Sequence, residues 1–133
     1  MSLLEPHLPD GTGCLAWLSG GRDAYLLVSR LVGSREWFLP EFLCPVVPRV
    51  LTKANVRCIP YRVGGLKDAL AKSTGPRVVV LAWDVGGQPC EADWNTAERD
   101  GDVVAEDRYL WAGLPRHVAP VRRNRFVIRS VHK

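Results

Sequence analysis

The chain has 133 residues, enough to bury the core of one domain but few for two. Hydrophobic residues make up 47% of it and charged residues 24%, a composition that excludes an intrinsically disordered protein. The net charge of +4 is unevenly distributed, because residues 1–115 carry −2 and the last eighteen residues carry +6.

The N-terminal stretch "MSLLEPHLPD" lacks the basic and apolar regions of a signal peptide. The longest unbroken apolar run, Val78 to Trp83, is far too short to span a membrane. The four cysteines are scattered without a C-x-x-C pair, so we expect neither a metal site nor a disulfide framework. A cytoplasmic protein without a membrane partner is the resulting expectation.

In chain order, short apolar strands alternate with helical patterns. Apolar residues recur with helical spacing from Ala24 to Val32, and Gly33 ends that helix. "WFLP" predicts a strand that Pro40 ends, and a second helical pattern begins at Pro45. "VRCIPY" then predicts a strand, and "GGLKDALAKS" a short helix.

The second half continues the alternation. "PRVVVLAW" is a continuous apolar run, typical of a parallel strand that is buried on both faces. "GDVVAED" and "RFVIRS" predict two more strands, with the loop "GLPRHVAPVRRN" between them. We therefore predict an α/β fold, a three-layer α/β/α arrangement with a mainly parallel sheet. The expected core comprises Val78–Trp83, Val103–Ala105, Leu27, Leu31, Val46 and Val50.

Three places in the chain could carry chemistry. In "LSGGRDA", Ser19 and two glycines lead into a helix, where backbone amides could hold a phosphate or where the serine could simply cap the helix. Asp107 follows an apolar strand and could pair with a cationic ring nitrogen or cap the next turn, whereas Glu106 should point the opposite way. Lys133 could form a Schiff base with an aldehyde cofactor or be a surface charge.

The basic residues near the C-terminus could form a nucleic-acid or anion site, or else a solvated or covered edge. They are Arg116, Arg122, Arg123, Arg125, Arg129 and Lys133.

Taken in order, these motifs resemble the large domain of fold-type I pyridoxal phosphate enzymes, specifically the DegT/DnrJ/StrS family of sugar aminotransferases. The resemblance runs from about Ser19 to Lys133. "SGGRDAYLLVSRL" is similar to the family's S-G-R/T-x-A-L helix start, "FLPEFLCPVV" to its "lPxyxCP" strand end, and "LAWDVGGQP" to its "hyfG" turn at Gly86. "VVAED" is similar to "viED", and "SVHK" to "S-x-R-K".

The resemblance implies a pyridoxal phosphate cofactor. Its phosphate would be bound by backbone amides of the helix start, at Gly20, Gly21 and Arg22, with Ser130 as a further phosphate ligand. Asp107 would keep the pyridine nitrogen protonated, and Lys133 would hold the cofactor as an imine and move the substrate's α-proton.

The activity implied is transfer of an amino group from a donor such as glutamate to a keto acceptor, in this family usually a sugar nucleotide, by a homodimer. In the family, the cofactor lysine is followed by the rest of the large domain and a small C-terminal domain. The resemblance therefore implies that residues 1–133 form one partial domain, which is the N-terminal part of the family's large domain. The small C-terminal domain would be absent, and this part would be inactive alone.

The sequence departs from the family at two motif positions, and Arg108, Tyr109 and Trp111 are also bulkier than the small residues usual after this aspartate. Cys44 stands where many members have an aromatic residue that stacks on the cofactor, and Leu110 stands where His or Gln is common. Two other interpretations stay open: a non-catalytic interaction module on the same scaffold, and a nucleic-acid-binding domain that uses the basic C-terminal segment.

Overall fold

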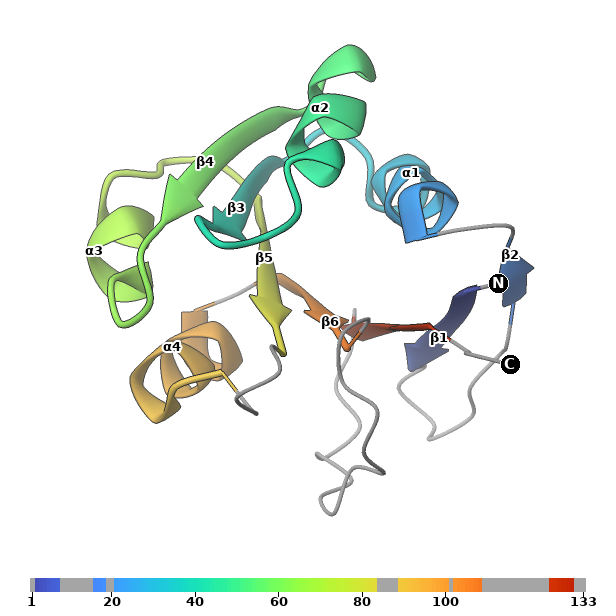
Figure 1. The fold of residues 1–133 in the computed structure, drawn as a ribbon. Coiled ribbons are helices and arrows are strands. Elements are labelled where there is room, and N and C mark those ends of the chain that lie inside the picture. Colours follow the sequence, from blue (N-terminus) through green and yellow to red (C-terminus); the bar gives the residue numbers. More distant parts are fainter. Residues whose placement is uncertain are drawn as a thin grey trace.

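A computed structural model describes residues 2–7, 16–18, 21–83, 89–100, 102–108 and 125–130 of the chain, with side chains for 21–83, 89–100, 102–108 and 125–128. The described residues form helices and strands that alternate along the chain (Figure 1). The helices are α1 (Gly21–Val32), α2 (Val46–Lys53), α3 (Leu66–Ala71) and α4 (Glu91–Asp100). The strands are β1 (Ser2–His7), β2 (Ala16–Leu18), β3 (Glu36–Pro40), β4 (Arg57–Tyr61), β5 (Arg77–Ala82), β6 (Val103–Asp107) and β7 (Arg125–Ser130).

The strands form one sheet in the order β2-β1-β7-β6-β5-β3-β4. The five strands from β7 to β4 are parallel, and β1 pairs antiparallel with both β2 and β7. The predicted α/β class with a mainly parallel sheet is therefore confirmed. Helices α2, α3 and α4 connect the strands from β3 to β6 and explain their parallel order, because parallel strands need a crossover that returns the chain to the same end of the sheet.

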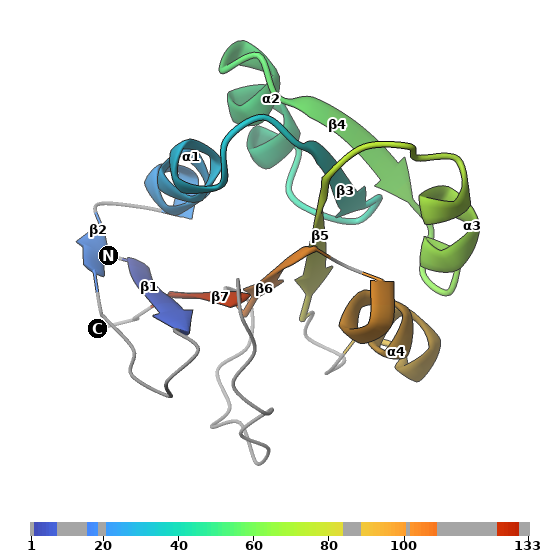
Figure 2. The same ribbon diagram turned by 180° about the vertical axis from the view of Figure 1, so that it is seen from behind.

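Helices cover both faces of the sheet (Figures 1 and 2). On one face, Val78 and Val80 of β5 pack in a cluster with α1 and α2, and on the other, Val79 and Leu81 pack with α3 and α4. Successive strand residues point to opposite faces, so a strand covered on both sides needs an unbroken apolar run. This is why "VVVLA" shows no alternation between apolar and polar residues.

The helices bury different residues from some that the sequence pattern predicted. Leu31 is 61% exposed and Val46 is also exposed, so their placement in the core was wrong. The neighbouring stripes face the sheet instead: α1 buries Ala24, Tyr25 and Val28, and α2 buries Val47 and Leu51. Leu27 and Val50 are half-buried.

Gly33 ends α1 as predicted, with a φ of 72°, in the left-handed region that glycine adopts without steric cost. Helix α4 and strands β1 and β2 were not predicted. No helix among the described residues is both long and apolar enough to cross a membrane.

Candidate functional site

Strands β5 and β6 end at the same level of the sheet, and β7 continues two residues beyond it, to Ser130. In the sheet register, Ala82 of β5 lies beside Asp107 of β6, and Asp107 lies beside Ile128 of β7. Ligands of parallel α/β sheets bind outside the carboxyl ends of the strands, so this row of residues is where a site is expected.

A cavity of about 430 Å³ lies at this row, between the N-terminus of α1 and the segment that joins β3 to α2. Most of its wall is apolar, and Arg22, Tyr25 and Asp107 contribute polar groups. The residues that line it are Gly21, Arg22, Tyr25, Phe42, Leu43, Cys44, Val46, Val47, Ala82, Trp83, Asp107 and Ile128.

Asp107 is hydrogen-bonded to Tyr25 in the wall of this cavity. The Tyr25 hydroxyl donates to Oδ2 of Asp107 at 2.5 Å, and both residues are buried. Burial, together with the negative charge of Asp107, raises the pKa of Tyr25 well above its ordinary value. The phenol is therefore protonated at every physiological pH and acts as a neutral donor to the carboxylate.

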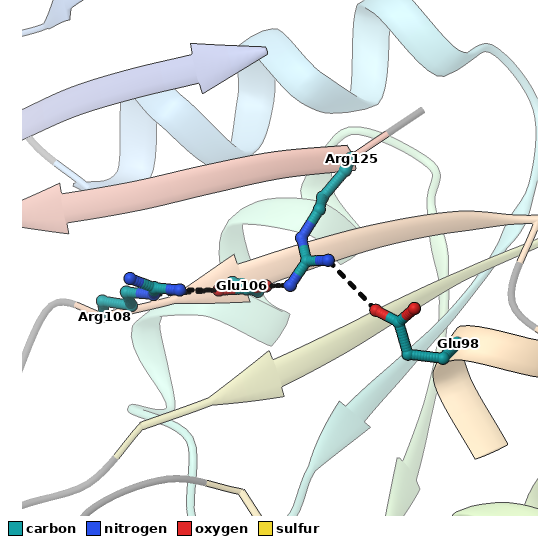
Figure 3. A network of polar contacts seen from close by, with 4 residues as sticks. All are labelled: Glu98, Glu106, Arg108 and Arg125. Carbon is teal, nitrogen blue, oxygen red and sulfur yellow. Dashed lines mark hydrogen bonds and ion pairs between the residues drawn. The ribbon is translucent and has the colours of Figure 1, made fainter. Parts of the chain in front are cut away.

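Glu106 points to the opposite face of the sheet from Asp107, as the strand alternation predicted. It belongs to a polar network with Arg108, Arg125 and Glu98 (Figure 3). Its Oε2 accepts hydrogen bonds from Arg108 Nε at 2.9 Å and Nη2 at 2.6 Å, and its Oε1 is ion-paired with Arg125 Nη2. Arg125 Nη1 donates to Oε1 of Glu98 on α4 at 3.0 Å. Glu106 and Asp107 are thus not an acid–base pair.

Two tryptophans pack against the arginines of this network. The Arg108 guanidinium lies 4.4 Å from the ring centre of Trp83, and that of Arg125 lies 5.2 Å from the ring centre of Trp94. Burial lowers the pKa of Arg125, and the adjacent Glu98 opposes this shift. Trp83 also lines the cavity, so the network contacts one residue of the cavity wall.

Arg125 is one of the six basic residues that were predicted to form a nucleic-acid or anion site. It is only 3% exposed and is paired with Glu98 and Glu106, so its charge is not presented to a polyanion. The side chains of the other five basic residues of that segment lie outside the described ones.

Of the predicted site residues, Gly21, Arg22 and Asp107 line one cavity. Cys44 lines it too, and is exposed. Ser130 is the last residue of β7 and is described by its backbone alone. Gly20, Gly86, Leu110 and Lys133 lie outside the described residues, as does the loop at 113–124.

Sequence reasoning missed Tyr25, Phe42 and Trp83 as cavity residues. Tyr25 offered one signal, because a phenol just over one turn after a glycine-led helix start lies close to whatever that start binds. In the part of the chain that has been described, no group of three His, Cys, Asp or Glu side chains is arranged to hold a metal ion.

Comparisons with protein families, curated proteins and solved structures found no match for this chain.

Proposed function

We propose that this domain binds pyridoxal phosphate in the cavity at the ends of β5, β6 and β7 and is the cofactor-binding part of an aminotransferase. One observation carries the proposal: Gly21, Arg22 and Asp107, which motifs from distant parts of the sequence assign to the two ends of the cofactor, line the same cavity.

The cavity suits such a ligand in size and chemistry. Its volume of about 430 Å³ lies in the range of small-molecule sites, which are mostly apolar with a few polar groups. The first backbone amides of α1 have no partner within the helix, and the helix dipole favours an anion there. Asp107 lines the cavity and is the type of acceptor that suits a cationic ring N–H; within the wall it also accepts from the Tyr25 hydroxyl.

Aromatic surface in the cavity also fits a flat ring. Cys44 cannot stack on a ring, but Phe42 and Trp83 line the same cavity and can contribute aromatic contacts.

Each proposed residue has a defined task. Bound pyridoxal phosphate supplies an electron-withdrawing ring that stabilises the charge left when a substrate loses its α-proton. Asp107 accepts a hydrogen bond from the ring N–H and so keeps that proton in place. The amides at Gly21 and Arg22 hold the phosphate, and Lys133 moves the α-proton as general base and acid.

The proposed reaction transfers an amino group from an amino donor to a keto acceptor, with a keto-sugar nucleotide as the acceptor class. A homodimer in the cytoplasm is proposed as the working form.

A reductive trapping experiment tests the proposal. Pyridoxal phosphate should give a visible-absorbing imine that borohydride fixes on Lys133, and Lys133→Ala should abolish the labelling. Asp107→Ala should weaken binding at least about tenfold, as loss of a charge-assisted hydrogen bond does. Asp68→Ala, which removes an exposed carboxylate on α3, is the matched control and should bind normally. Labelling spread over several lysines, with no effect of Asp107→Ala, would refute the proposal.

A second candidate is a non-catalytic module that binds a ligand in the same cavity. The exposed Cys44 at the position of the stacking aromatic residue favours it. Specific cofactor binding without transamination of any amino donor, in a protein that also contains the C-terminal small domain which the resemblance implies, would distinguish this function from the first.

A further inference from the structure

Tyr25 connects the two parts of the cavity that hold its polar groups. It lies about one helical turn after Gly21 and Arg22, and its hydroxyl donates to Asp107 at the end of β6. Since a helix is a stiff element, this hydrogen bond helps to set the distance between the first amides of α1 and the Asp107 carboxylate.

Tyr25 is itself held firmly. It is 1% exposed, and its ring packs at 51° to that of Trp37 in β3, with the ring centres 6.3 Å apart. Trp37 is completely buried in the same cluster. A phenol enclosed in this way has few accessible rotamers, so the carboxylate that it contacts is restrained as well.

We propose that Tyr25 is a positioning residue that orients the Asp107 carboxylate toward a ligand ring N–H and sets the span between this carboxylate and the phosphate-binding amides. The inference rests on the proposed function. According to this inference, Tyr25 makes the cavity bind a phosphorylated ring with a protonated pyridine nitrogen more tightly than a ring of the same shape that has carbon at this position.

The physical basis is the directionality of a hydrogen bond to an ionised group. Charge-assisted hydrogen bonds are roughly twice as strong as neutral ones, and they weaken steeply when the donor is misaligned. Without the phenol, the carboxylate loses the buried donor that holds its Oδ2 from the side of α1. The raised pKa of Tyr25, caused by its burial and by Asp107, keeps the donor proton in place wherever a pyridine nitrogen is protonated.

The test uses two probes that cannot form an imine with surface lysines. One is pyridoxamine 5'-phosphate, and the other is its analogue with carbon in place of the ring nitrogen. Titration calorimetry on the full 133-residue chain gives the ratio of the two dissociation constants. For the unmodified chain we expect a preference for the nitrogen ring of about tenfold to a hundredfold, the range expected of one charge-assisted hydrogen bond.

In Tyr25→Phe we expect this preference to fall to within about threefold, because the carboxylate loses the directional contact from the Tyr25 hydroxyl. The affinity for the carbon analogue should change far less, since that ligand makes no bond to Asp107. Should Tyr25→Phe not fold, 4-fluorophenylalanine at position 25 fills the place of the hydroxyl without donating, and the same loss is expected.

Tyr61→Phe is the matched control. Tyr61 is also buried, and its hydroxyl donates to the Val80 carbonyl oxygen at 2.6 Å, but it packs in the cluster on the opposite face of the sheet. It should keep the preference of the unmodified chain.

The outcomes separate this inference from the proposed function. A Tyr25→Phe chain that folds and keeps the preference would overturn the positioning role alone. Tighter binding of pyridoxamine phosphate by Tyr25→Phe would also overturn it, because the phenol would then compete with the ligand for Asp107. An unmodified chain that shows no preference for the nitrogen ring would overturn both.

Discussion

Glu106→Gln should strongly destabilise the protein, because Glu106 is a fully buried carboxylate shared by two arginines (Figure 3). Its two oxygens accept from Arg108 and pair with Arg125. Glutamine has nearly the same shape but offers one oxygen and one NH₂ group. One of the two arginines must therefore face an amide donor, and the buried network gains a net positive charge.

The size of the effect follows from the burial of the groups. Breaking a buried ion pair by removing one partner costs about 3–5 kcal/mol, since the remaining charge stays away from water. Arg125 keeps Glu98 as a partner, so we expect the lower end, about 3 kcal/mol. A domain of this size loses roughly 3–5 °C of melting temperature per kcal/mol, so the midpoint should fall by about 9–15 °C.

Urea and thermal unfolding followed by circular dichroism measure this loss. Glu41→Gln is the matched control, because Glu41 pairs with Arg62 at 3.7 Å and both side chains are more than half exposed. Exposed pairs contribute at most about 1 kcal/mol. If Glu106→Gln costs no more than Glu41→Gln, the buried network does not stabilise the fold as argued.

Three further changes have defined outcomes. Asp93→Ala should cost about 1–3 kcal/mol in urea unfolding, because Asp93 of α4 accepts from the amides of Gly64 at 2.7 Å and Leu66 at 3.2 Å and holds the start of α3. Gly33→Ala should cost about 1 kcal/mol from its positive φ alone, since a Cβ there meets no atom within 4 Å. The contribution of the buried tyrosines to stability should be complete below about pH 9 and be lost above pH 10, because burial raises the pKa of Tyr25 and Tyr61 in the folded state above the ordinary value of 10.

The sign of the pH effect follows from proton binding. The folded state holds the phenol protons more tightly than the unfolded state, so its advantage is complete below pH 10 and is lost as the pH rises further, by up to about 1.4 kcal/mol per pH unit for each tyrosine. Tyrosinate absorbance at 295 nm that rises together with unfolding is the expected signal. Ionisation of all tyrosines near pH 10 in the folded protein would contradict it.

For Gly33→Ala, an unchanged midpoint of urea unfolding would count against a positive φ at that residue.

The sequence predicted those elements that local pattern determines. The apolar run of β5 requires burial on both faces, and Gly33 ends α1 by its own conformational freedom. Helix α4 was missed because it has no apolar stripe and buries Asp93, Thr96 and Ala97 instead. Leu31 was wrongly placed in the core, since two adjacent stripes of one helix carry apolar residues and spacing alone does not tell which of them faces the sheet.

The candidate site was also predictable only where the sequence signal is local, and contacts between distant residues were missed. Asp107 and the start of α1 were identified because a strand end and a helix start each have a local signature, and the α/β architecture then brings them to one edge of the sheet. The hydrogen bond between Tyr25 and Asp107 joins residues 82 positions apart and has no such signature. Once formed, it makes the position of the carboxylate depend on the packing of α1 against Trp37. If Tyr25 positions Asp107 as proposed, a substitution in the core beneath α1 would alter ligand selection as well as stability.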